Sequence, residues 1–137
     1  MRARDHALYA AGVLGFAAVA ATAAWLHPDP SGLGTHTQLH LPPCGLWAVF
    51  RRPCPSCGMT TAFALLLHGR PLTALRVQPA GVGVFAASLA LWLYLPVGWL
   101  RRRPFEHLFA LRAFLPTVVG LILLILGVWA WRLAAGW

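Results

Sequence analysis

The chain has 137 residues, of which 59% are hydrophobic and 10% charged, and its mean hydropathy is +0.68. Soluble domains carry about 25% charged residues, so the composition excludes an ordinary soluble protein and predicts an integral membrane protein. Its net charge of +8 comes from 11 Lys+Arg against 3 Asp+Glu. The arginines stand at the ends of apolar runs, where membrane topology requires cations, so nucleic-acid binding is not expected. So few acids also exclude a two-carboxylate hydrolase.

Three apolar stretches are long enough to cross a bilayer, which takes about 20 residues. The first, residues 7–26, contains Gly12 and Gly15, which suit close packing against another helix. Its length favours a retained helix over a cleavable signal peptide. The second comprises residues 79–100, with Pro79 in its first turn, and the third comprises residues 113–132.

Two further segments lie between the first two spans. Residues 27–56 form a loop rich in proline and glycine, and residues 57–69 have a helical pattern that Gly69 and Pro71 end. A helix of that length reaches about 18 Å, too short for a hydrocarbon core of about 30 Å. The sequence therefore predicts a single all-α membrane domain, residues 1–137, with about three transmembrane helices and a re-entrant or interfacial half-helix.

The basic run at residues 101–103 follows the second span directly. Because clustered arginines mark the cytoplasmic side, this run predicts a cytoplasmic N-terminus and an extracytoplasmic loop at residues 27–56.

The loop ends in the motif Cys54-Pro55-Ser56-Cys57-Gly58. Two cysteines at this spacing form a tight turn, here called the knuckle, whose two sulfurs can either bind zinc or form a reversible disulfide. Gly58 suits the tight turn. If the knuckle is a redox site, Cys54 and Cys57 are its reactive pair, and the helix N-terminus at Cys57 stabilises a thiolate.

A zinc site needs two more ligands. Cys44 is the candidate for one and His40, His36 or His68 for the other, which gives a Cys₃His set. An external, oxidising location favours a disulfide instead. Thr60 and Thr61 follow the knuckle. Their hydroxyls either bond backbone carbonyls within the half-helix or form the polar floor of a small pocket.

The order of these elements resembles a bacterial membrane family called domain of unknown function 2752. That family shows Cys-Pro-x-Cys-Gly-x-Thr-Arg, a short helix, a Gly-Asp step and Ala-Leu-Arg leading to Asn-Pro. Here Cys54 to Thr60, Gly69, residues 74–76 and Pro79 match in order. Thr61, Arg70 and Gln78 stand where the family usually has Arg, Asp and Asn. The resemblance implies a small multi-helix protein of the bacterial plasma membrane and supplies no activity.

Three functions fit the sequence. The favoured one is a non-enzymatic membrane subunit or binding component with an external cysteine knuckle, closed by a disulfide or by zinc. The alternatives are a thiol-disulfide or metal-handling protein, and a small transporter or channel subunit. The expected partners are the lipid bilayer and either other membrane proteins or further copies of this chain.

Overall fold

A computed structural model describes residues 2–110 and 112–136, and these residues are helical without strands. The elements are α1 (Ala3–Trp25), the 3₁₀ helix η1 (Thr35–Leu39), α2 (Gly45–Phe50), α3 (Met59–Leu67), α4 (Pro71–Val77), α5 (Pro79–Leu100), the 3₁₀ helix η2 (Phe105–Leu108) and α6 (Phe114–Ala134). In this part of the chain three helices, α1, α5 and α6, are long and apolar enough to cross a membrane. The predicted fold class is confirmed.

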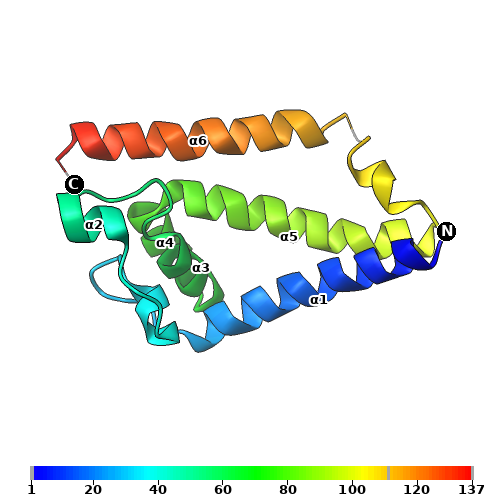
Figure 1. Cartoon of the computed structure of the whole chain (residues 1–137), viewed down its shortest axis with the longest axis horizontal. Coiled ribbons are helices and arrows are strands. Elements are labelled where there is room, and N and C mark those ends of the chain that lie inside the picture. The colour runs from blue at the N-terminus through cyan, green and yellow to red at the C-terminus, as the bar shows by residue number, and fades with distance from the viewer. Residues whose placement is uncertain (1, 111, 137) are drawn as a thin grey trace.

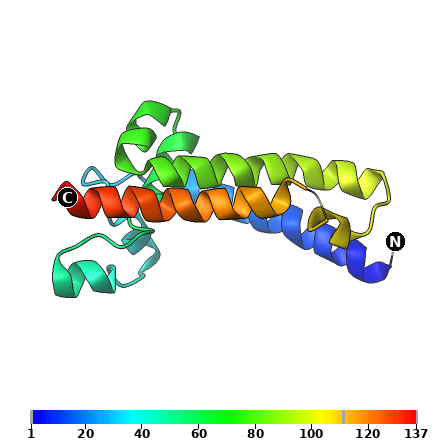
Figure 2. The same cartoon turned by 90° about the horizontal axis from the view of Figure 1, so that it is seen from above.

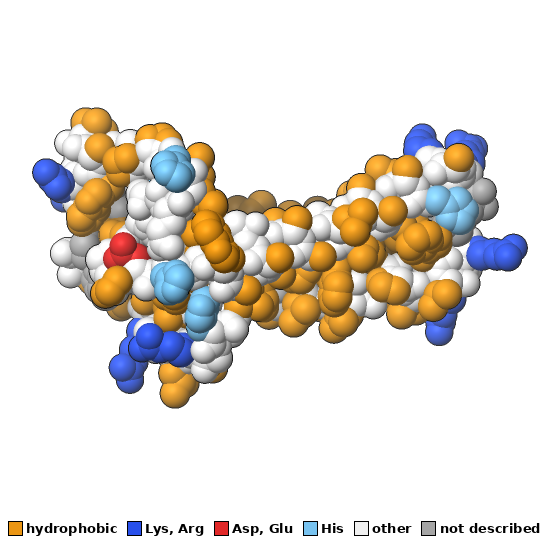
Figure 3. Space-filling model, turned by 90° about the horizontal axis from the view of Figure 1, so that it is seen from below, with side chains coloured by type: hydrophobic (Ala, Val, Ile, Leu, Met, Phe, Trp, Pro, Cys, Tyr) orange, Lys and Arg blue, Asp and Glu red, His pale blue; other side chains and the backbone are white. Residues whose placement is uncertain are grey.

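The three long helices lie along one axis, with α5 between α1 and α6, and the short helices α2, α3 and α4 gather at one end (Figure 1). Seen from above, the α3–α4 pair projects to one side of the long helices and α2 to the other (Figure 2). Arginine and histidine side chains stand at both ends of the molecule, with apolar side chains between them (Figure 3). This pattern is that of a membrane protein with two polar ends.

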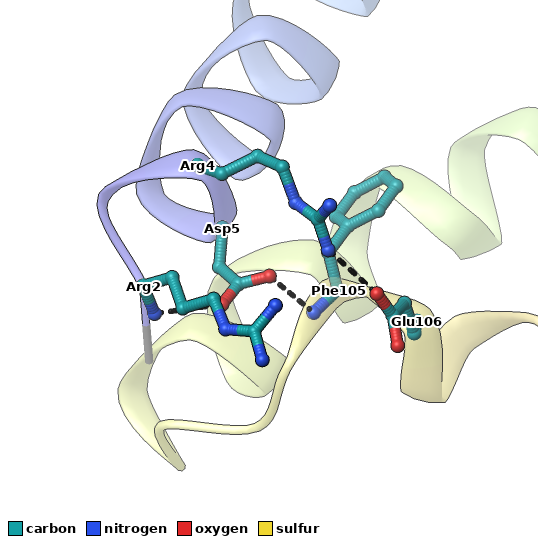
Figure 4. A network of polar contacts seen from close by, with 5 residues as sticks. All are labelled: Arg2, Arg4, Asp5, Phe105 and Glu106. Atoms are coloured by element: carbon teal, nitrogen blue, oxygen red, sulfur yellow. Dashed lines mark hydrogen bonds and ion pairs between the residues drawn. The ribbon is translucent and has the colours of Figure 1, made fainter.

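The bounds of α5 coincide with the second predicted span, whereas α1 begins at Ala3 rather than at residue 7. The carboxylate of Asp5 explains the earlier start. It accepts hydrogen bonds from the backbone N–H of Arg2, at 2.8 Å, and from that of Phe105, at 3.3 Å (Figure 4). An acidic side chain in the first turn satisfies N–H groups that have no helical partner.

The same end of the molecule is held by contacts between α1 and the connection that contains η2. Arg4 forms an ion pair with Glu106 at 2.6 Å (Figure 4), and the hydroxyl of Tyr9 donates to the carbonyl of Arg103 at 3.3 Å. Tyr9, Leu95 and Leu108 are buried together beneath these contacts. The basic run at residues 101–103 therefore lies next to the start of α1.

The predicted loop at residues 27–56 contains two short helices, η1 and α2. The prediction of an irregular loop was therefore wrong for these two segments. Pro42 and Pro43 separate the helices, since proline cannot donate a backbone hydrogen bond. The apolar run Leu46 to Phe50 then turns into α2, which Arg51 ends with a φ of 53°.

The predicted half-helix is α3, whose nine residues reach about 13 Å. It ends in a Schellman motif, in which Gly69 has a φ of 71° and the N–H of Arg70 bonds the carbonyl of Leu65 at 2.9 Å. Ala62 and Ala64 have no exposed surface, and α3 packs against α1, α4 and α5. The half-helix is thus interior to the cluster of short helices, with its N-terminus at the cysteine knuckle.

Small residues set the packing of the long helices. A Cβ added at Gly12 of α1 would lie 2.9 Å from Leu95, and one added at Gly83 of α5 would lie 2.9 Å from Leu124. The close packing predicted for Gly12 is confirmed, whereas a Cβ at Gly15 would meet no atom within 4 Å. Much of α6 faces outward, with Leu115 and Leu123 more than three-fifths exposed.

Gly58 offers a test of how the knuckle is joined to α3. Its φ is 88°, and an added Cβ would lie 3.0 Å from the carbonyl oxygen of Gly32. We expect Gly58→Ala to lower the midpoint of thermal unfolding in detergent, as measured by tryptophan fluorescence. The variant is destabilised by backbone strain of about 1 kcal/mol and also by the steric clash with Gly32.

Gly69→Ala is the matched control, since Gly69 also has a positive φ but open space around its Cβ position. The Gly58 variant should lose clearly more stability. If both variants lost the same stability, the close approach of residue 58 to Gly32 would not contribute to the effect of Gly58→Ala.

Candidate metal centre

The knuckle is a tight turn in which the N–H of Cys57 donates to the carbonyl of Cys54 at 3.1 Å. The left-handed conformation of Gly58 redirects the chain into α3. The turn brings the two sulfurs to 2.9 Å, well beyond a disulfide bond of about 2.05 Å, and both residues are free thiols. Cys57 is buried and Cys54 is half-buried.

Cys44 reaches the same place from a different element. It stands at the N-cap of α2, and its Sγ lies with those of Cys54 and Cys57 in a group whose atoms are all within 4.8 Å of one another. The structure therefore brings together three of the four predicted ligands. His40 ends η1 and is not a member of this group. Its role as the fourth ligand stays a prediction.

Three side chains from the long helices hold the backbone of the knuckle. The carbonyl of Pro53 accepts a hydrogen bond from Trp129 Nε1 at 2.9 Å. The carbonyl of Pro55 accepts one from Gln78 Nε2 at 3.0 Å. The carbonyl of Cys57 accepts one from Arg132 Nη1 at 3.0 Å. Gln78 belongs to the motif, whereas Trp129 and Arg132 were expected only as residues of the membrane interface at the end of the last span. Arg132 lies in the last turn of α6, and its burial follows from the fold and not from any sequence pattern.

The other motif residues position the turn. Gln78 is the buried N-cap of α5, directly before Pro79 at the first helical position, and its Oε1 accepts no hydrogen bond within the described residues. The buried hydroxyl of Thr61 lies 2.7 Å from that of Thr35 in η1. This contact joins α3 to the loop. Thr60 lines a cavity beside the sulfurs.

The thiols of Cys44 and Cys57 differ in acidity. The backbone N–H of Trp47, which bonds the Cys44 sulfur at the start of α2, lowers the pKa of Cys44 from 9.0 to about 7. Burial raises the pKa of Cys57 to about 12. Cys44 therefore ionises at a lower pH than Cys57.

This donor set suits a thiophilic metal ion. Zinc binds thiolates at about 2.3 Å, which places the sulfurs of a tetrahedral site about 3.8 Å apart, a spacing within the range of this group. Three thiolates and a divalent ion have a net charge of −1. The guanidinium of Arg132, which bonds the carbonyl of Cys57, supplies a compensating charge in a buried position.

Fold and site together define a small α-helical membrane protein with a three-cysteine cluster at one end. Residues 44–93 match the model of the family described as "Protein of unknown function (DUF2752)". The match confirms the resemblance drawn from the motif, and it begins at the first cysteine of the cluster. Neither the curated proteins nor the solved structures gave a match to the chain.

The hydrogen bond from Trp129 can be tested with a substitution that keeps most of the ring. We expect Trp129→Phe to destabilise the protein by about 1 kcal/mol, because the carbonyl of Pro53 loses its donor. Thermal unfolding in detergent measures the effect. Trp131→Phe on the same helix is the control, since Trp131 is 59% exposed. Equal destabilisation by both changes would contradict the role of Trp129.

The acidity of Cys44 predicts an order of alkylation in chelator-treated protein. Iodoacetamide attacks the thiolate, so the modification rate of Cys44 should rise with pH and reach half its maximum near pH 7, whereas Cys57 should stay slow until far higher pH. Peptide mapping at each pH gives the three rates. In denaturant all three cysteines should converge on about pH 8.5. A Cys44 that titrates there in the folded protein would contradict the structure.

Proposed function

We propose that this chain is a non-enzymatic subunit or binding component of the bacterial plasma membrane that holds one thiophilic metal ion, zinc in the first place, at Cys44, Cys54 and Cys57. The observation that supports this proposal is the convergence of Cys44. A disulfide needs only the two sulfurs of the knuckle, whereas a third sulfur brought within 4.8 Å from another helix completes most of a tetrahedral site.

The proposed topology has the N-terminus in the cytoplasm and the cysteine cluster outside. Its support is that the α1 start and the Arg101–103 connection lie at one end of the long helices, while α2 and α3 lie at the other (Figure 1). A membrane-impermeant maleimide, applied to intact cells that express a cysteine-free variant, should label a cysteine placed at Gln38 and not one placed at Arg102. The reverse pattern would overturn this orientation.

A second candidate is a membrane thiol-disulfide protein. The 2.9 Å separation of the Cys54 and Cys57 sulfurs favours it, because oxidation to a disulfide needs little movement. Cys44 would then be a third thiol that resolves mixed disulfides.

Metal analysis of purified protein separates the two candidates. We expect one zinc per chain by elemental mass spectrometry. Replacing any one of the three cysteines with serine should weaken zinc binding by more than about tenfold. Mutating a residue that only hydrogen-bonds a metal ligand already lowers metal affinity by about 10–100-fold.

Thr117→Ala, on an exposed residue of α6 outside the sulfur group, is the control and should retain zinc. Metal-free protein whose mass shows a Cys54–Cys57 disulfide, reversible with dithiothreitol, would contradict the metal proposal and support the redox candidate.

A further inference from the structure

A structural zinc ion takes four ligands, and the three sulfurs leave one position of the proposed site to be filled. Within the described part of the chain, the group of converging metal-binding atoms contains no imidazole. The sequence offers three histidines around the cysteines, His36, His40 and His68, each of which can supply a ring nitrogen. Their positions in the fold differ, and these positions distinguish the three residues as ligands.

His68 lies at the end of α3 that is remote from the sulfurs. It follows the last residue of this helix, whereas the knuckle precedes the first. The nine residues between them, at 1.5 Å each, place the two ends about 13 Å apart. The Nδ1 atom of His68 is also 2.7 Å from the carbonyl oxygen of Ala64. His68 is therefore part of the C-terminal cap of α3.

The two histidines of the η1 region differ in what they face. His40 is exposed at the C-terminal end of η1 and does not line the cavity beside the sulfurs. His36, four residues earlier, is half-buried and lines this cavity together with Cys44, Cys54 and Cys57. Among the described residues that line the cavity, His36 is the one histidine.

Two contacts hold the backbone next to His36 against the beginning of α3. The hydroxyl of Thr35, directly before it, lies 2.7 Å from that of Thr61, and both side chains are buried. The carbonyl oxygen of Gly32 lies 3.0 Å from the position that a Cβ on Gly58 would occupy. The segment that carries His36 is therefore fixed beside the knuckle and the first turn of α3.

We propose that His36 is the fourth ligand of the metal ion, which makes the centre a closed Cys₃His zinc site. This inference rests on the proposed metal-binding function and adds the residue that completes the site. The ring of His36 lies outside the sulfur group, and it turns onto the ion as the ion binds, since metal binding and the ordering of its ligands are coupled. The ion then joins three segments, η1, α2 and the start of α3.

X-ray absorption spectroscopy of the purified, zinc-loaded full chain in detergent tests this ligand set. We expect three sulfurs at about 2.3 Å and one imidazole nitrogen at about 2.0–2.1 Å from the zinc. His36→Ala should remove the imidazole signal and lower zinc affinity by at least about tenfold, measured by competition with a chromophoric chelator. His40→Ala is the matched control at the end of the same 3₁₀ helix and should change neither result.

With zinc removed, His36→Ala and the unaltered chain should unfold at the same temperature, which separates a lost ligand from a misfolded protein. The spectrum of the unaltered chain decides the matter even where a variant fails to fold. Unchanged zinc affinity in His36→Ala, or loss of the imidazole signal in His40→Ala, would overturn the assignment. Zinc bound by three sulfurs without imidazole would overturn this inference alone, whereas a chain that binds no zinc would contradict the metal proposal itself.

Discussion

A buried stretch of irregular backbone must find protein partners for its polar groups, because an unpaired buried N–H or C=O group costs free energy. Residues 53–57 meet this constraint through donors from Gln78, Trp129 and Arg132. The position of the sulfurs therefore depends on α5 and α6, although the cysteines belong to neither. Two of the three donors lie beyond residues 44–93, the part that matches the family. The support from α6 is thus a feature of this chain that the family match does not cover.

The sequence predicted those features that depend on local chemistry. Pro79 and the arginines after Leu100 delimit α5, and Gly69 with Pro71 delimits α3, so both helices were placed well. Contacts between distant segments were not predictable. The early start of α1 depends on Asp5 meeting Phe105, and the anchoring of the knuckle depends on side chains of the last helix. Cys44 was named as a ligand from its chemistry alone, and nothing in its spacing fixed its approach to Cys57.

The way the loop is held argues for a structural role of the cluster. Among the described hydrogen bonds, the one between Thr35 and Thr61 joins the first half of the loop to α3, and those of Gln38 close the loop on its own residue His27. The second half, which contains α2 and Trp47, meets the knuckle through the sulfur of Cys44. A metal ion would turn that contact into bonds that join α2 to the start of α3. A dithiol that cycled between Cys54 and Cys57 would leave α2 without this permanent link, whereas a metal clip would keep α2 joined to α3 at all times.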